Sequence, residues 1–156
     1  GIDGKDSHTK RVNVRWLVAL LVLASVCVAD NWKYTRDFDL KKDEMYHLTF
    51  QEGSNIKDLY FRWTLHKNEG LVMHLNYDGF VHQFILYERY HRRGYRLQLF
   101  KPDPRAITSA PYLWILFQDY NYDTEIAYLR LLVHDGNRNV TLTLEEKVQD
   151  VGFRGY

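Results

Sequence analysis

Arginine and tyrosine side chains are concentrated in one short segment, residues 88–96. Guanidinium groups and aromatic faces together bind phosphate, carboxylate or sugar groups, such as those of an anionic envelope polymer or lipid. The candidate contact residues are Arg89, Tyr90, His91, Arg92, Arg93, Tyr95 and Arg96. The alternative is a solvated turn, because runs of charge usually face water. Its charge would then be balanced by Asp119, Asp123 and Glu125.

A histidine interrupts an otherwise apolar series, because His82 falls at an inward position of the segment 80–87. It is either a ligand-facing, pH-sensitive group or a residue at the rim of the core, satisfied by a backbone carbonyl. No two histidines have the spacing of a metal motif, so we expect no metal and no cofactor. Ser54 and Ser109, the only serines after residue 29, lie in no nucleophile motif, so we expect no catalytic residues and no enzyme.

Apolar residues alternate with polar ones from Trp32 onward, which is typical of strands with one buried face. Short turn signals separate these runs, and no amphipathic helix of useful length follows Ala29. The pattern predicts an all-β fold: an antiparallel meander of about eight or nine strands, folded as a β-sandwich or a small barrel. A hydrophobic signal or anchor helix would precede it. We expect one β-domain over residues 30–146 and a flexible tail over 147–156.

Two turns fix the expected register of the central strands. Asn68, Glu69 and Gly70 suit a three-residue hairpin loop with Gly70 in the left-handed conformation, which pairs Leu65 with Met73. Asp78-Gly79 suits a two-residue turn, which pairs Tyr77 with Phe80, Leu75 with His82, and Met73 with Phe84.

The hairpin over residues 71–87 is apolar on its second face as well. Val72, Val81 and Ile85 alternate with the residues that we expect in the core. Either a second sheet covers this face, which favours a sandwich, or another protein does. These three residues are therefore candidate apolar contacts for a partner.

An uncharged apolar run, Trp16 to Ala29, follows Arg11 and Arg15 and precedes Asp30. This layout is typical of a secretory signal peptide, and we assign residues 12–29 to a signal peptide or, alternatively, to a retained N-terminal anchor. Residues 1–11 are either residues added for expression or a cytoplasmic n-region. Both alternatives place the β-domain in the periplasm, free or held at the inner membrane.

Composition excludes several classes of protein. Residues 30–156 hold 17 basic and 18 acidic side chains, which gives no support for nucleic-acid binding. The single cysteine, Cys27, lies in the export segment, so the β-domain has no disulfide, thiol nucleophile or cysteine–zinc site.

The stretch Leu59 to Leu99 contains FRWTLHKNEGLVMHLNYDGFVHQFILYERY. It resembles small, uncharacterised exported β-proteins of epsilon-class Gram-negative bacteria, which carry a similar run after a signal peptide. The resemblance covers about a third of the chain and implies a Gram-negative periplasmic setting. It assigns no functional residues.

Three functions remain open at this point. We expect a non-enzymatic periplasmic β-domain that acts by protein–protein contact, in an envelope-spanning assembly or as a homo-oligomer. One alternative is a lipocalin-like carrier of a small apolar or amphipathic ligand. The other is an envelope hydrolase that uses His82 or His91 with a nearby carboxylate.

Overall fold

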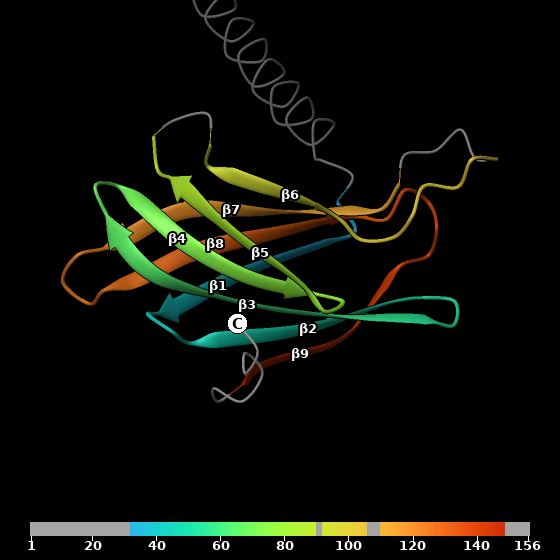
Figure 1. Cartoon of the computed structure of the whole chain (residues 1–156), viewed down its shortest axis with the longest axis horizontal. Helices are drawn as coiled ribbons and strands as arrows, with labels where there is room; N and C mark the ends of the chain where they lie inside the picture. Colours follow the sequence, from blue (N-terminus) through green and yellow to red (C-terminus); the bar gives the residue numbers. More distant parts are fainter. Residues whose placement is uncertain (1–31, 90–91, 106–109, 149–156) are drawn as a thin grey trace, which may run out of the picture. The chain divides into compact units, whose positions relative to one another are not determined.

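The computed structural model describes residues 32–89, 92–105 and 110–148. These residues contain nine strands and no helix, which confirms the all-β fold. The four-stranded sheet has the order β1-β8-β7-β6 and the five-stranded sheet the order β5-β4-β3-β2-β9, with every pair antiparallel (Figure 1). The strands are β1 (Tyr34–Lys41), β2 (Met45–Glu52), β3 (Asn55–Lys67), β4 (Gly70–Tyr77), β5 (Phe80–Tyr87), β6 (Gly94–Gln98), β7 (Tyr112–Asn121), β8 (Ile126–His134) and β9 (Thr141–Val148).

Strand connectivity departs from a plain meander at two strands. The strands β2 to β5 and β6 to β8 do follow one another within their sheets, but β1 pairs with β8 and β9 pairs with β2. An ion pair between Arg36 of β1 and Glu145 of β9 joins the two sheets, with 3.0 Å between Nε and Oε2. Strand β9 also runs to Val148, two residues beyond the expected domain end.

The hairpin of β4 and β5 has the expected register. Tyr77 pairs with Phe80, Leu75 with His82, and Met73 with Phe84. Asp78 and Gly79 both have positive φ, which is the backbone of a two-residue type I′ turn. Turn chemistry and apolar alternation agree here, and the prediction is confirmed.

The hairpin of β3 and β4 differs from the expectation. Asn68 and Glu69 take the positive φ values of a two-residue turn, and Gly70 instead begins β4. A β-bulge between Trp63 and Leu65 then moves the register again, so Trp63 pairs with Met73. The shorter turn and the bulge each move the pairing by one residue. Together they move it by two, an even number, so Trp63 still faces the core.

The bulge exchanges the faces of two residues near the hairpin tip. Leu65, expected in the core, is exposed beside Val72 on the outer face of the five-stranded sheet. His66 instead lies inside, where its ring stacks on Tyr120 of β7 at a centroid distance of 3.7 Å. A periodicity of two cannot reveal this exchange, because the bulge adds one residue to one strand.

One core of apolar side chains lies between the two sheets and draws on both. Two buried hydrogen bonds tie the sheets together. Trp63 of β3 donates its indole N–H to the Leu40 carbonyl of β1 at 2.8 Å. Tyr77 of β4 donates its hydroxyl to the Leu99 carbonyl just after β6 at 2.5 Å. Two packed sheets with a filled interior correspond to the sandwich alternative.

Strands β7 and β8 lie inside their sheet, and their outward-facing residues are mostly half-buried. The described residues include no helix that is long and apolar enough to cross a membrane. The predicted signal or anchor segment, 12–29, lies outside the described residues, as do residues 149–156 of the predicted tail.

Candidate functional site

Strands β5 and β6 are edge strands of different sheets and approach each other at one side of the sandwich (Figure 1). Their inward side chains pack against each other there. The Tyr95 ring of β6 stacks on Phe84 of β5 at 3.8 Å between centroids. The Tyr95 hydroxyl lies 2.9 Å from Nδ1 of His82. His82 thus has a side-chain hydroxyl as its partner and not the backbone carbonyl that one alternative expected, and it also lines a groove.

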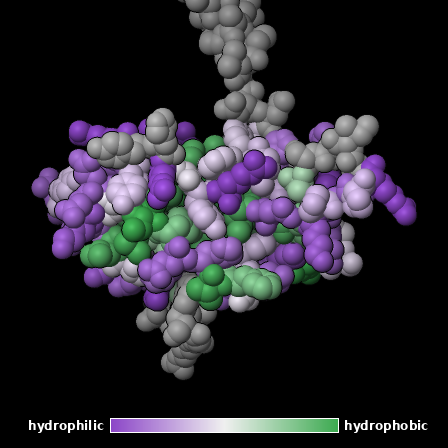
Figure 2. All heavy atoms as spheres, turned by 45° about the horizontal axis from the view of Figure 1, so that its top comes forward, coloured by the Kyte–Doolittle hydropathy of each residue, from purple (hydrophilic) through white to green (hydrophobic). Residues whose placement is uncertain are grey.

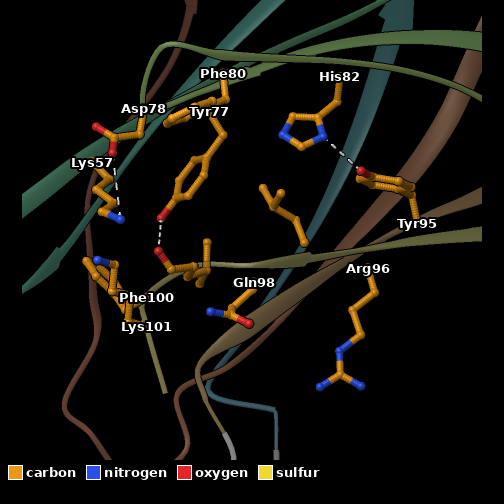
Figure 3. Close-up of a pocket in the computed structure, with 12 residues that line it drawn as sticks. Lys57, Tyr77, Asp78, Phe80, His82, Tyr95, Arg96, Gln98, Phe100 and Lys101 are labelled. Carbon is orange, nitrogen blue, oxygen red and sulfur yellow. Dashed lines mark hydrogen bonds and ion pairs between the residues drawn. The ribbon is translucent and has the colours of Figure 1, made fainter. Parts of the chain in front are cut away.

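A groove of about 440 Å³ opens beside this contact, between β6 and the β4–β5 turn (Figure 3). Tyr77, Leu97 and Leu99 contribute buried apolar surface to it, and Phe80 lines it as well. Lys57 lies at its rim, where its ammonium group is 3.7 Å from the Asp78 carboxylate. The same ammonium group is 5.3 Å from the centroid of the Phe100 ring.

The predicted arginine and tyrosine cluster does not form one surface among the described residues. Alternation along β6 puts Tyr95 on the inner side and Arg96 on the outer face, where its guanidinium lies 3.9 Å from the centroid of the Tyr112 ring. Arg96 still lines the groove, but in Figure 3 its side chain points away from the Tyr95 ring. The side chains of Arg89, Arg92 and Arg93 are exposed at the tip, and Tyr90 and His91 lie outside the described residues.

The three predicted apolar contacts lie on the outer face of the five-stranded sheet. Val72 pairs with Leu65 on one side and with Ile85 on the other, so these three residues form a row across β3, β4 and β5. Leu65 is 48% exposed, Ile85 44% and Val81, also on β5, 51%. We call these four residues the apolar row, in which Val81 stands apart from the other three because Gln83 lies between it and Ile85 on this face.

The second sheet packs against the opposite face, so nothing in the described part of the chain covers the apolar row. Of the two alternatives for this face, a covering sheet is therefore wrong for the described residues. Figure 2 shows hydrophobic atoms that reach the surface between polar side chains. Scattered apolar residues are common on surfaces, but a row across three paired strands is a contiguous patch.

A histidine cluster that the sequence analysis missed also lies on this outer face. His47 has Nε2 2.8 Å from Asp58 Oδ1 and Nδ1 3.1 Å from Glu146 Oε1. Its ring stacks on Tyr60 with 4.2 Å between centroids, and Thr49 donates its hydroxyl to Asp58 at 2.7 Å. A carboxylate oxygen thus lies within hydrogen-bond distance of each ring nitrogen, so the imidazole bridges Asp58 and Glu146.

Charge and hydrogen bonding suit this cluster to a structural role. Thr49 donates its hydroxyl proton to Asp58, so this proton is not directed at the imidazole as nucleophile activation by a general base requires. Partial burial of the Asp58 carboxyl favours a higher pKa, but hydrogen bonds from His47 and Thr49 outweigh it and lower the pKa below its usual value. The cluster joins β9 to β2 and β3. The β2–β3 hairpin pairs His47 with Tyr60 and Thr49 with Asp58, and the β2–β9 pairing, which spans about a hundred residues of sequence, adds Glu146.

A second missed histidine is the buried His66, which the bulge turns inward. Its Nε2 lies 3.8 Å from Glu88 Oε1, and neither atom has a hydrogen-bond partner among the described residues. Burial lowers the pKa of this imidazole, and the nearby Glu88 charge opposes that effect only in part.

The described residues contain no group of three His, Cys, Asp or Glu side chains that could hold a metal ion. The hydrogen-bond partner of His82 is a tyrosine and not the carboxylate that the hydrolase alternative requires. The chain matches no protein-family model, no curated protein and no solved structure. The site must therefore be interpreted from its own geometry.

Proposed function

We propose that this chain is an exported, non-enzymatic β-domain that acts by protein–protein contact in the cell envelope. The apolar row Leu65, Val72, Ile85 and Val81 carries this proposal, because it is an apolar patch with no cover on the outside of a well-packed sheet. Each side chain that is half exposed gains roughly 1 kcal/mol when a partner buries it. The row is thus suited to the central, apolar part of an interface.

The sequence of residues 12–29 supports export to the periplasm, with a retained inner-membrane anchor as the alternative. The balanced charge of the chain supports a protein partner over a nucleic acid. A resident of the envelope with a contact surface of this kind would act within an envelope assembly or with further copies of itself.

Site-specific photo-crosslinking in the cells that produce the protein tests this function. A photoreactive residue replaces Val72 in the full chain, and a second variant carries it at Leu116, a half-buried position on the outer face of the other sheet. We expect a discrete protein adduct from position 72 and none from position 116. The absence of an adduct at 72, or equal adducts at both positions, would refute the proposed surface.

The groove beside β6 favours a second candidate function, the binding of a small amphipathic ligand. Its apolar wall and the rim ammonium group of Lys57 would suit a molecule with an apolar body and an anionic end. The site differs from the barrel interior of a lipocalin, because it lies at the side of the sandwich. Native mass spectrometry of the freshly purified chain tests it, since a bound ligand adds mass and an unliganded spectrum would count against it.

A further inference from the structure

We propose that strand β5 pairs with β5 of a second copy of this chain, antiparallel and with Gln83 facing Gln83 across a two-fold axis. This inference rests on the proposed contact function and names its partner. The joined edges would turn two five-stranded sheets into one continuous ten-stranded sheet. The outward backbone groups of β5, its lack of charge and the position of the apolar row carry it.

The two-residue turn fixes which backbone groups of β5 point outward. Tyr77 and Phe80 flank that turn and therefore form a hydrogen-bonded pair, after which hydrogen-bonded and open pairs alternate. The N–H and C=O groups of Val81, Gln83 and Ile85 consequently point away from β4. The amide of Tyr87, the next residue in this series, does point outward, because it donates to the Arg92 carbonyl at 3.0 Å.

Only one antiparallel register uses all three outward residues of both copies. It places Val81 opposite Ile85 and Gln83 opposite Gln83, and it forms about six backbone hydrogen bonds. A shift by two residues in one direction leaves Ile85 unpaired. A shift in the other direction requires Tyr87, whose amide is already bonded to Arg92. The edge is thus complementary to itself.

Charge distinguishes β5 from the other three edge strands. An edge is normally protected from pairing by charged side chains, by proline or by short length. Strand β1 carries Arg36 and Asp37, β9 carries Glu145 and Glu146, and β6 has only five residues, with Arg96 among them. Strand β5 reads FVHQFILY and has eight residues, no charge and no proline.

The apolar row continues across the proposed axis. In this register Ile85 of one copy lies beside Val81 of the other on the same outer face. The strip then runs from Leu65, Val72 and Ile85 of one copy to Val81 and Asn76 of the second without a charged residue between them. Strand pairing would therefore bury part of the surface on which the proposed function depends.

Introducing a positive or a negative charge at position 83 tests the two-fold axis. We expect the full chain to be a dimer by size exclusion with light scattering. Gln83→Lys and Gln83→Glu should each weaken self-association roughly tenfold, because like charges then face each other. A mixture of the two variants should restore the dimer. Thr35→Lys, an exposed position on the charged edge β1, serves as the control and should leave the dimer intact.

Disulfide trapping tests the register independently of charge. Hydrogen-bonded antiparallel partners have Cα atoms about 5.5 Å apart, within the range of about 4.4–6.8 Å that a disulfide spans. In a Cys27→Ser background, Gln83→Cys should form a covalent dimer on oxidation, whereas Thr35→Cys should not. Because residue 83 is exposed on an edge, circular dichroism should show unchanged folding.

The outcomes separate the two proposals. A monomeric chain that also gives no disulfide at position 83 overturns the β5 dimer. If position 72 still crosslinks to a protein of different mass, the contact function stands with another partner. If the dimer forms but Gln83→Lys and Gln83→Glu do not restore it on mixing, the two-fold register is wrong.

Discussion

Replacing Tyr77 with phenylalanine removes one hydroxyl and leaves the ring in the core. That hydroxyl donates to the Leu99 carbonyl at 2.5 Å, and it joins β4 of the five-stranded sheet to the segment after β6 of the other sheet. The tyrosine is only 5% exposed, so the variant loses a buried hydrogen bond and almost no apolar contact.

The size of the stability loss depends on whether the Leu99 carbonyl finds another hydrogen-bond donor once the hydroxyl is gone. A typical net hydrogen bond contributes about 1 kcal/mol, and an unsatisfied buried acceptor costs about 1–3 kcal/mol. Leu99 lines the groove, so a water molecule from the groove can occupy the space that the hydroxyl leaves, which favours the lower part of that range. We therefore expect Tyr77→Phe to lower the free energy of unfolding by about 1.5 kcal/mol and the melting temperature by roughly 4–8 °C.

Urea unfolding and calorimetry of the full chain measure this loss. Tyr122→Phe is the matched control, because Tyr122 is 66% exposed and its hydroxyl should contribute almost nothing. A loss below about 0.5 kcal/mol for Tyr77→Phe, or an equal loss in both variants, would refute the claim that this hydroxyl ties the sheets together.

Three further predictions follow from single contacts. His47→Leu removes the hydrogen bonds between the imidazole ring and two half-exposed carboxylates, so urea unfolding should show a free energy of unfolding lower by about 1–2 kcal/mol. Carboxyl NMR of the same variant should show a higher pKa for Asp58. The pKa of His66 is lowered on folding by burial, so the unfolded chain binds a proton first as the pH falls through about 6.5, the ordinary pKa of histidine. Stability should therefore fall as the pH drops below about 7, and His66→Phe should make urea midpoints less dependent on pH. Gly94→Ala would place a Cβ 2.9 Å from the Trp114 ring, so its urea midpoint should fall by the equivalent of about 1–2 kcal/mol.

Local patterns predicted much of the sheet. The Asp78-Gly79 turn and the alternation on both sides of it agree, so the register of β4 and β5 could be derived residue by residue. The outer-face positions of Val72, Val81 and Ile85 follow from the same parity. What local patterns could not show is the bulge after Trp63, because no residue type marks it, and it exchanges Leu65 with His66.

Long-range pairing explains the remaining differences. Strand β1 pairs with β8 and β9 pairs with β2, although most of the chain separates the two strands of each pair. No local signal determines these partners. The second of these pairings brings Glu146 to His47, a contact that no local pattern predicts. The arginine segment looked like one surface in the sequence, but the alternation of side chains along β6 sends Tyr95 and Arg96 to opposite faces.

Amide hydrogen exchange of the full chain, followed residue by residue by NMR, tests the contact surface most directly. The amides of His82 and Phe84 bond to β4 and should be protected under all conditions, which provides an internal reference. We predict that the outward amides of Val81, Gln83 and Ile85 are protected in the unaltered chain at high concentration and exposed in Gln83→Lys. Rapid exchange of these three amides at every concentration, equal in both proteins, would contradict the account.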